Sequence, residues 1–199
     1  MQSLKDKFDT VCSRIGEERR LDSTGSDPIY YLVFPVTEIV DVKRQTRVWI
    51  PKLENKGWNV VVFSFSTVIN SILRGHRLRS SWLTGEKMLL SRAQAAIPPA
   101  ANGEINKTLT KALTEGPELL TRLREAITEA GSKAQGLLLL TDVEALHPYM
   151  RINSIEAAIQ GEARCPVIVL YPGKREGKTS LSFLEFYPPD PNYRSEHIG

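Results

Sequence analysis

The fold is decided by residues 29–66, which read IYYLVFPVTEIVDVKRQTRVWIPKLENKGWNVVVFSFS. The first seven of them, IYYLVFP, are too few for a helix and rich in residues that favour strands, so they predict a buried strand. A helix follows, in which Pro51 predicts a kink or a restart because proline has no backbone N–H to donate. The segment WNVVVFSFS (Trp58–Ser66) predicts a second buried strand. Strand, helix and strand in this order indicate a right-handed crossover and a pair of parallel strands.

Helical and strand-like segments continue on both sides of this unit. Before it, apolar residues recur at helical spacing in residues 4–15, and after it residues 68–130 show only helical periodicity. The sheet then resumes with two continuous apolar runs, GLLLLTD (Gly136–Asp142) and PVIVLYP (Pro166–Pro172). The segment SLSFLEFY (Ser180–Tyr187) alternates polar and apolar residues, which is typical of a half-exposed edge strand.

The order of these segments predicts an α/β fold with a mostly parallel sheet of about five strands and flanking helices. We expect one domain over residues 1–199, with a helical insertion at about 68–130 between the second and third strands. An edge hairpin is predicted near the C-terminal end of the sheet. The tail PPDPNYRSEHIG shows no periodicity and is predicted to be irregular.

The composition is that of an ordinary globular protein, with 41% hydrophobic and 25% charged residues. The formal net charge of +3 is too small to indicate a nucleic-acid-binding protein by itself. The N-terminal residues lack the apolar core of a signal peptide, and no apolar stretch is long enough to span a bilayer, so we expect a cytoplasmic protein without a membrane partner. Cys12 and Cys165, the two cysteines, form neither a disulfide framework nor a zinc pattern and are expected to be buried thiols.

One segment, GKREGKT (Gly173–Thr179), resembles the phosphate-binding P-loop GxxxxGK[ST] but has three intervening residues instead of four. A P-loop also has to open a helix, whereas the residues after Thr179 alternate with the period of a strand. The segment is therefore predicted to be the turn of a charged hairpin, and ATP hydrolysis is not expected.

Other chemistry-bearing residues give no complete site. Asp142 and Glu144 follow a strand end, where ligands of open α/β sheets bind, and two carboxylates could hold Mg²⁺ through water. The alternative is that Asp142 turns or caps the loop after its strand. The histidines His76, His147 and His197 have no zinc-binding spacing, and no serine lies in the GxSxG motif that exposes a nucleophile. No catalytic residue, metal site or cofactor is predicted, although a triad of distant residues stays open.

A basic segment is the strongest electrostatic feature. Between residues 70 and 95 the local net charge is +4, more than that of the whole chain. Its basic residues, which surround Trp82, are Arg74, Arg77, Arg79, Lys87 and Arg92. Arginines beside a tryptophan can hold phosphates and stack on a base, so a nucleic-acid-binding segment is one hypothesis. The same side chains can instead dock an acidic protein surface, or simply form a solvated helix face or internal ion pairs.

Five stretches together are typical of one family: YYLVFPVTEIVDVKRQ, KGWNVVVFSFSTVI, GLLLLTDVEALHPYMRINSIEAAIQG, CPVIVLYPG and LSFLEFYPPDPNYRSEHIG. They resemble the BrxB family, the small B component of bacteriophage exclusion (BREX) defence systems. The resemblance covers nearly the whole chain, is most specific in LTDVEALHPYMR and YPPDPNYRSEHIG, and is least distinctive from about Leu78 to Gly116. Pro51 departs from what the family's second helix leads us to expect.

The resemblance implies a non-enzymatic adaptor in a multi-protein system. Such systems include a DNA methyltransferase, an AAA-type ATPase and the alkaline-phosphatase-like protein PglZ, and PglZ is the preferred direct partner. The family brings no established catalytic residues, and a homodimer stays open. The alternative function is a nucleic-acid-binding module that uses the segment Arg74–Arg92. A nucleotide-sensing domain that has lost its phosphate loop is a third hypothesis.

Candidate partner contacts follow from the specific stretches and from the basic segment. Tyrosine and arginine are favoured at interface hot spots because they combine a large contact area with directional hydrogen bonds. The tail residues among the candidates could instead pack back on the sheet. The candidates are His147, Tyr149 and Arg151 after the third strand, Tyr193, Arg194 and His197 in the tail, and Arg74, Arg77, Arg79 and Trp82 in the basic segment.

Overall fold

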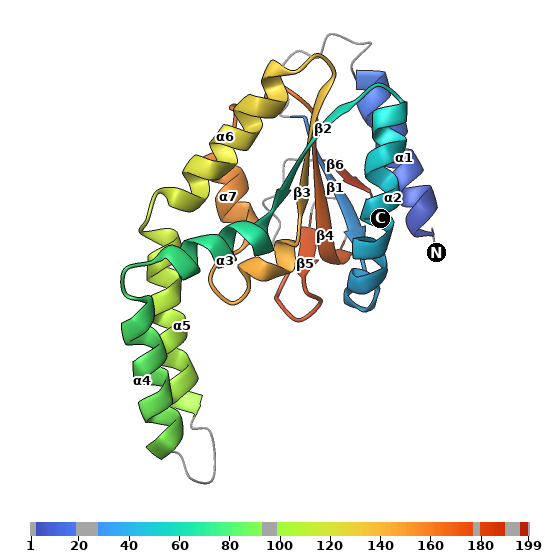
Figure 1. The fold of residues 1–199 in the computed structure, drawn as a ribbon. Coiled ribbons are helices and arrows are strands. Elements are labelled where there is room, and N and C mark those ends of the chain that lie inside the picture. Colours follow the sequence, from blue (N-terminus) through green and yellow to red (C-terminus); the bar gives the residue numbers. More distant parts are fainter. Residues whose placement is uncertain (1–2, 19–27, 93–98, 177–179, 190–195, 199) are drawn as a thin grey trace.

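The computed structural model describes residues 3–18, 28–92, 99–176, 180–189 and 196–198. Within these ranges a mostly parallel six-stranded sheet lies between two layers of helices, which confirms the predicted α/β class (Figure 1). The strands are β1 (Ile29–Phe34), β2 (Asn59–Ser64), β3 (Gly136–Thr141), β4 (Val167–Glu176), β5 (Ser180–Phe183) and β6 (Glu196–Ile198). The helices are α1 (Leu4–Glu18), α2 (Ile39–Asn55), α3 (Phe65–Gly75), α4 (Arg79–Arg92), α5 (Pro99–Thr114), α6 (Glu118–Ser132) and α7 (Ile152–Ala158), with the short 3-10 helices η1 (Val36–Glu38) and η2 (Val143–Leu146).

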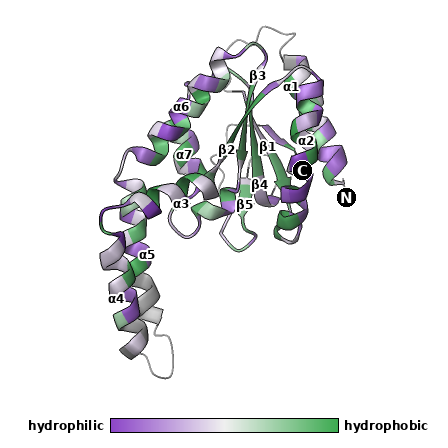
Figure 2. Cartoon of the chain, in the orientation of Figure 1, coloured by the Kyte–Doolittle hydropathy of each residue, from purple (hydrophilic) through white to green (hydrophobic). Residues whose placement is uncertain are grey.

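The central strands are buried on both faces, which explains why their sequences are continuous apolar runs rather than alternating ones. Successive side chains of a strand point to opposite faces, so in β1 Tyr31 joins the core under α3, α6 and α7, and Leu32 joins the core under α1 and α2. In the second core the rings of Phe8 and Trp49 stack at 4.6 Å and join α1 to α2. Figure 2 shows the strands as the most uniformly hydrophobic part of the chain.

The strands lie in the order β2-β3-β4-β1-β6, and each neighbouring pair is parallel. The prediction that the first two strands pair with each other is wrong, because β3 and β4 lie between them. β2 is instead the edge of the sheet, and its Val62 is 45% exposed. Its apolar run resembles that of a central strand, so its residue types alone do not reveal the edge position.

The C-terminal part contains the predicted hairpin and one strand more than expected. β5 pairs antiparallel with the end of β4, from Gly173 with Phe183 to Glu176 with Ser180, so residues 173–176 of the P-loop-like segment are strand rather than turn, and residues 177–179, where the predicted turn falls, lie outside the described residues. β6 pairs parallel with β1 and lies in the tail, for which the sequence predicts irregular structure. The described residues therefore form six strands rather than about five.

Helix α2 passes through Pro51 without ending there, so the predicted restart is wrong. Proline removes one backbone donor from the helix. Trp49 and Leu53, on either side of it, are almost completely buried against the sheet. Burial of two large apolar side chains stabilises the continuous helix. This gain in free energy exceeds the cost of the one hydrogen bond that proline removes.

The predicted helical insertion consists of α3 to α6. α3 and α6 pack on the sheet through buried residues such as Ile69 and Leu123. α4 and α5 pair with each other and project away from the sheet (Figure 1), and we call these two helices the helical arm. Among the described residues, no helix combines the length and the apolar character that crossing a membrane requires.

Candidate functional site

A network of charges lies at the carboxyl ends of the parallel strands. Lys43 of α2 places its Nζ 2.9 Å from Asp142 Oδ1 and 2.6 Å from Glu144 Oε1. The second oxygen of Asp142 accepts a hydrogen bond from the Ser64 hydroxyl at 2.6 Å. Ser64 also caps α3, because its Oγ accepts a hydrogen bond from the Thr67 backbone N–H at 3.2 Å. The network therefore ties β2, β3, α2 and α3 together at this edge of the sheet.

The two carboxylates considered for magnesium already share the Lys43 ammonium. Burial raises the pKa of Asp142, but hydrogen bonds from Ser64 and Lys43 outweigh it and hold the pKa below its usual value. Burial lowers the pKa of Lys43, and its hydrogen bonds to Glu144 and Asp142 outweigh this and raise the pKa overall. Asp142 has a φ of 57°, so it is the turn residue that the sequence predicts, although its side chain does not cap η2.

This role of Asp142 gives a stability prediction. Asp142→Ala is expected to lower the free energy of unfolding by about 2 kcal/mol, because the acceptor for Ser64 is lost and alanine adopts a left-handed φ at a cost. Asp142→Asn should cost clearly less, since asparagine tolerates this conformation and its amide oxygen can still accept from Ser64. Urea unfolding of the two variants measures the difference, and equal losses would contradict this role.

A partly exposed aromatic surface forms where the loop after η2 meets the turn after β5. We call it the rim cluster: His147, Arg151, Phe186 and Tyr187. His147 Nδ1 and the Tyr187 hydroxyl share a hydrogen bond of 2.5 Å, and the Arg151 guanidinium lies 4.6 Å from the centroid of the Tyr187 ring. The centroid of the Phe186 ring lies 5.4 Å from the centroid of the His147 ring and 4.5 Å from that of the Tyr187 ring. Phe186 is nevertheless 64% exposed, so its contacts leave much of the ring in water.

The turn after β5 places Phe186 on the surface at a cost in backbone strain. Leu184 and Glu185 have φ values of 52° and 61°, a left-handed conformation that costs residues other than glycine about 1–2 kcal/mol each. The Glu185 carboxylate accepts a hydrogen bond from the Val36 backbone N–H at 2.9 Å, which fixes the turn against η1. Such strain is concentrated at functional surfaces, where a fixed side chain loses less entropy when a partner binds.

The structure places only two of the three loop residues predicted as partner contacts in the rim cluster. His147 and Arg151 lie in the rim cluster. Tyr149 does not: it is half-buried, packs against the core under α3, and has a pKa raised by that burial. Tyr193 and Arg194 lie outside the described residues.

Phe186 and Tyr187 are the two members of the rim cluster that sequence reasoning misses. The alternation of SLSFLEFY predicts a strand as far as Tyr187, in which Phe186 would be an ordinary strand residue. β5 instead ends at Phe183, and the chain turns at Leu184 and Glu185 without a glycine, asparagine or proline to indicate it.

His197 is a core residue rather than a surface contact, which corrects the prediction for this side chain. It lies on β6 with 7% of its surface exposed, and its ring meets that of Tyr31 edge to face at 5.6 Å. Burial, together with the charge of Arg175, lowers the pKa of His197 to about 4, so the ring is neutral at neutral pH. The alternative that the tail packs back on its own sheet is therefore correct for residues 196–198.

The basic segment runs from the end of α3 into the helical arm. Arg74, Arg77 and Arg79 are exposed there. Trp82 is half-buried, and its ring stacks on that of His76 with a centroid separation of 4.4 Å and an angle of 22°. One face of the indole is thus covered by the histidine ring.

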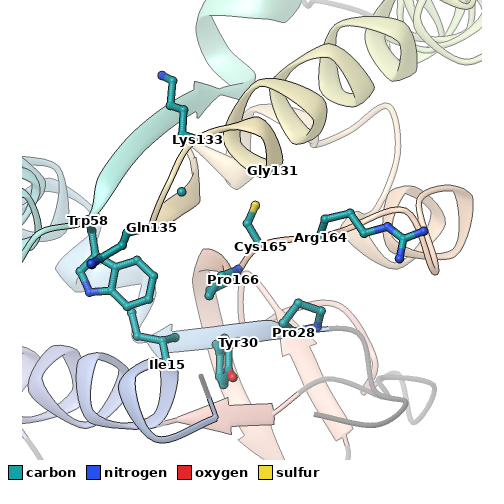
Figure 3. A pocket seen from close by; sticks show the side chains of 11 residues that line it. Ile15, Pro28, Tyr30, Trp58, Gly131, Lys133, Gln135, Arg164, Cys165 and Pro166 are labelled. Atoms are coloured by element: carbon teal, nitrogen blue, oxygen red, sulfur yellow. The ribbon is translucent and has the colours of Figure 1, made fainter. Parts of the chain in front are cut away.

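A cavity of about 320 Å³ lies at the opposite end of the sheet, beside the amino ends of the strands (Figure 3). Trp58 and Cys165 lie around it, whereas the charged ends of Lys133 and Arg164 point away from it. The Lys133 ammonium instead binds the Glu129 carboxylate at 2.7 Å. Burial raises the pKa of the Cys165 thiol, which keeps it protonated at neutral pH. Of the two ends of the sheet, the carboxyl end with its exposed rim cluster is the better candidate for a functional surface.

The comparisons with known proteins identify a family. Residues 81–198, more than half of the chain, match the family model described as "BREX protein BrxB". The match includes α4 from residue 81 onward, α5 and the whole rim cluster. No curated protein and no solved structure matches the chain.

Proposed function

The chain belongs to the BrxB family and hence to the BREX phage-defence proteins, and on this premise we propose that it is a non-catalytic adaptor. In this proposal it binds the alkaline-phosphatase-like PglZ protein through the rim cluster. Different residues support the absence of catalysis and the choice of the docking surface, whereas PglZ is chosen as the partner because the family resemblance implies it.

The exposed ring of Phe186 is the observation that carries the choice of surface. The ring is 64% exposed although its turn and its aromatic neighbours fix its position. Full burial of such a side chain by a partner is worth roughly 1.5–3 kcal/mol. Arg151 and His147 beside it add directional hydrogen-bond donors, and an aromatic residue with an arginine is the composition of an interface hot spot.

The charge network supports a structural role for the polar groups at the strand ends. In open α/β sheets this edge is where ligands usually bind. Asp142 and Glu144 are occupied by Lys43 and Ser64, and they hold η2, from whose end His147 extends. The network thus orders the loop that presents half of the rim cluster.

Co-purification tests the proposal as a whole. The protein carries an affinity tag and is expressed together with all other components of its own defence system. We expect the PglZ-like protein to be retained in a stoichiometric amount, and we expect the isolated protein to show no ATP turnover. Retention of no other component would overturn the adaptor function, and ATP turnover that resists further purification would overturn its non-catalytic character.

A further inference from the structure

The helical arm carries a second surface, distinct from the rim cluster, with the pattern of a protein-binding helix. Arg79, Leu83 and Lys87 lie four residues apart on α4 and therefore share one face of the helix. Leu83 is 47% exposed, and both basic residues are exposed as well. The face thus places an apolar side chain between two cations, each about one helical turn away.

Further exposed apolar and basic side chains lie elsewhere on the arm and beside its first residue. Leu78 and Met88 are 43% and 51% exposed, and Figure 2 shows hydrophobic and hydrophilic residues intermixed along α4. Arg74 and Arg77 add two more exposed cations where the arm leaves the sheet. Among the described side chains, none forms an ion pair with Arg74, Arg77, Arg79 or Lys87. Of the alternatives from the sequence, internal ion pairs are therefore not what these four residues form among the described side chains, and a solvated helix face is the alternative to a binding surface.

We propose that the helical arm binds an acidic amphipathic helix of another protein through the stripe Arg79–Leu83–Lys87. Charge complementarity requires an acidic partner, because residues 70–95 carry a net charge of +4. The exposed Leu83 side chain between the two cations requires an apolar face on that partner, and an amphipathic helix in contact with another helix supplies both the charge and the apolar face. With this surface the adaptor has two binding sites, so it can join two other components at once.

The same residues fit nucleic acid less well. Binding of single strands without sequence preference depends on aromatic rings on which bases stack. In the arm the Trp82 ring is half-buried and stacks on His76 at 4.4 Å. Leu83, the exposed side chain between the two cations of the stripe, is aliphatic and offers nothing to a phosphate backbone.

The test uses the full chain, an array of overlapping peptides that cover the other proteins of its defence system, and a short DNA duplex. We expect the chain to retain acidic amphipathic peptides. Arg79→Glu with Lys87→Glu should weaken this binding at least about tenfold, and Leu83→Ser should weaken it as well, since hot spots combine charge with apolar contact. Lys5→Glu with Lys52→Glu on α1 and α2 makes the same change in total charge and should leave the binding unchanged.

Each other outcome contradicts the arm proposal. Retention of no peptide, or of basic peptides alone, would overturn it. DNA binding that falls steeply with salt and is unaffected by Leu83→Ser would assign the arm to nucleic acid instead. The rim cluster is tested separately, because its variants should still retain the acidic peptides, so failure of one surface does not imply failure of the other. Unchanged thermal unfolding of each variant shows that the exposed substitutions leave the fold intact.

Discussion

Replacing Phe186 and Arg151 together with alanine is expected to weaken binding of the PglZ-like protein about 100-fold, which corresponds to about 3 kcal/mol. The expected loss has two sources. Phe186 offers an exposed ring that a partner can bury, and Arg151 offers a guanidinium already positioned over Tyr187. Titration calorimetry of the purified proteins measures the change, and each single variant should account for roughly half of the lost free energy.

The stability of the Phe186 variant serves as a control for this prediction. Because the ring is mostly exposed, its removal should change the free energy of unfolding by no more than about 0.5 kcal/mol. A matched double variant on α2, Val48→Ala with Lys52→Ala, also removes an exposed apolar and a basic side chain, and it should leave the affinity unchanged. If both double variants weaken binding equally, the rim cluster is not the docking surface.

Acidification is expected to destabilise the protein through His197 by up to roughly 3 kcal/mol. The pKa of this histidine falls from 6.5 to about 4 on folding, because burial disfavours the charged ring. The unfolded chain therefore binds a proton at a higher pH than the folded chain does. The stabilisation is fully present above pH 6.5 and is lost as the pH falls through about 4.

Urea unfolding at a series of pH values from neutral to pH 4 measures this loss. His197→Gln should remove most of the pH dependence in this range, because glutamine does not titrate. The Asp142 network does not account for it: the pKa of Asp142 is lowered from 3.8, so its contribution is lost only below that pH. If the free energy of unfolding depends on pH in the same way in the wild-type protein and in the His197→Gln variant, burial does not lower the pKa of this histidine.

The sheet could largely be predicted from the sequence because its strands are buried on both faces. The runs IYYLVF, GLLLLT and VIVLY each alternate between two cores, so nearly every position is apolar and the segments can be recognised. The order of the strands could not be predicted, because the run of the edge strand β2 resembles that of a central strand. β6 is three residues long and contains Glu196 and His197, so it has no apolar pattern of its own. It depends on pairing with β1, which lies far away in the sequence.

Two of the four residues of the rim cluster could be predicted from the sequence. His147 and Arg151 lie in the stretch that most specifically resembles the family, and they belong to the rim cluster. Phe186 and Tyr187 complete it only because the chain turns at Leu184 and Glu185 in a conformation that their residue types do not favour. Trp82 appears available in the sequence, but its contact with His76 needs the turn between α3 and α4 to form. Segments marked by continuous apolar runs were thus predictable, whereas the turn at Leu184 and Glu185 and the covering of Trp82 by His76 were not.

The size of the complex in solution tests the adaptor proposal most directly. The purified protein is mixed with the PglZ-like protein of its own system, and light scattering after size-exclusion chromatography gives the mass of each species. We expect a single complex with a stoichiometry of one to one or two to two, and we expect it to dissociate when Phe186 and Arg151 are replaced. Two separate peaks at concentrations well above the micromolar range, with the masses of the individual proteins, would contradict direct binding.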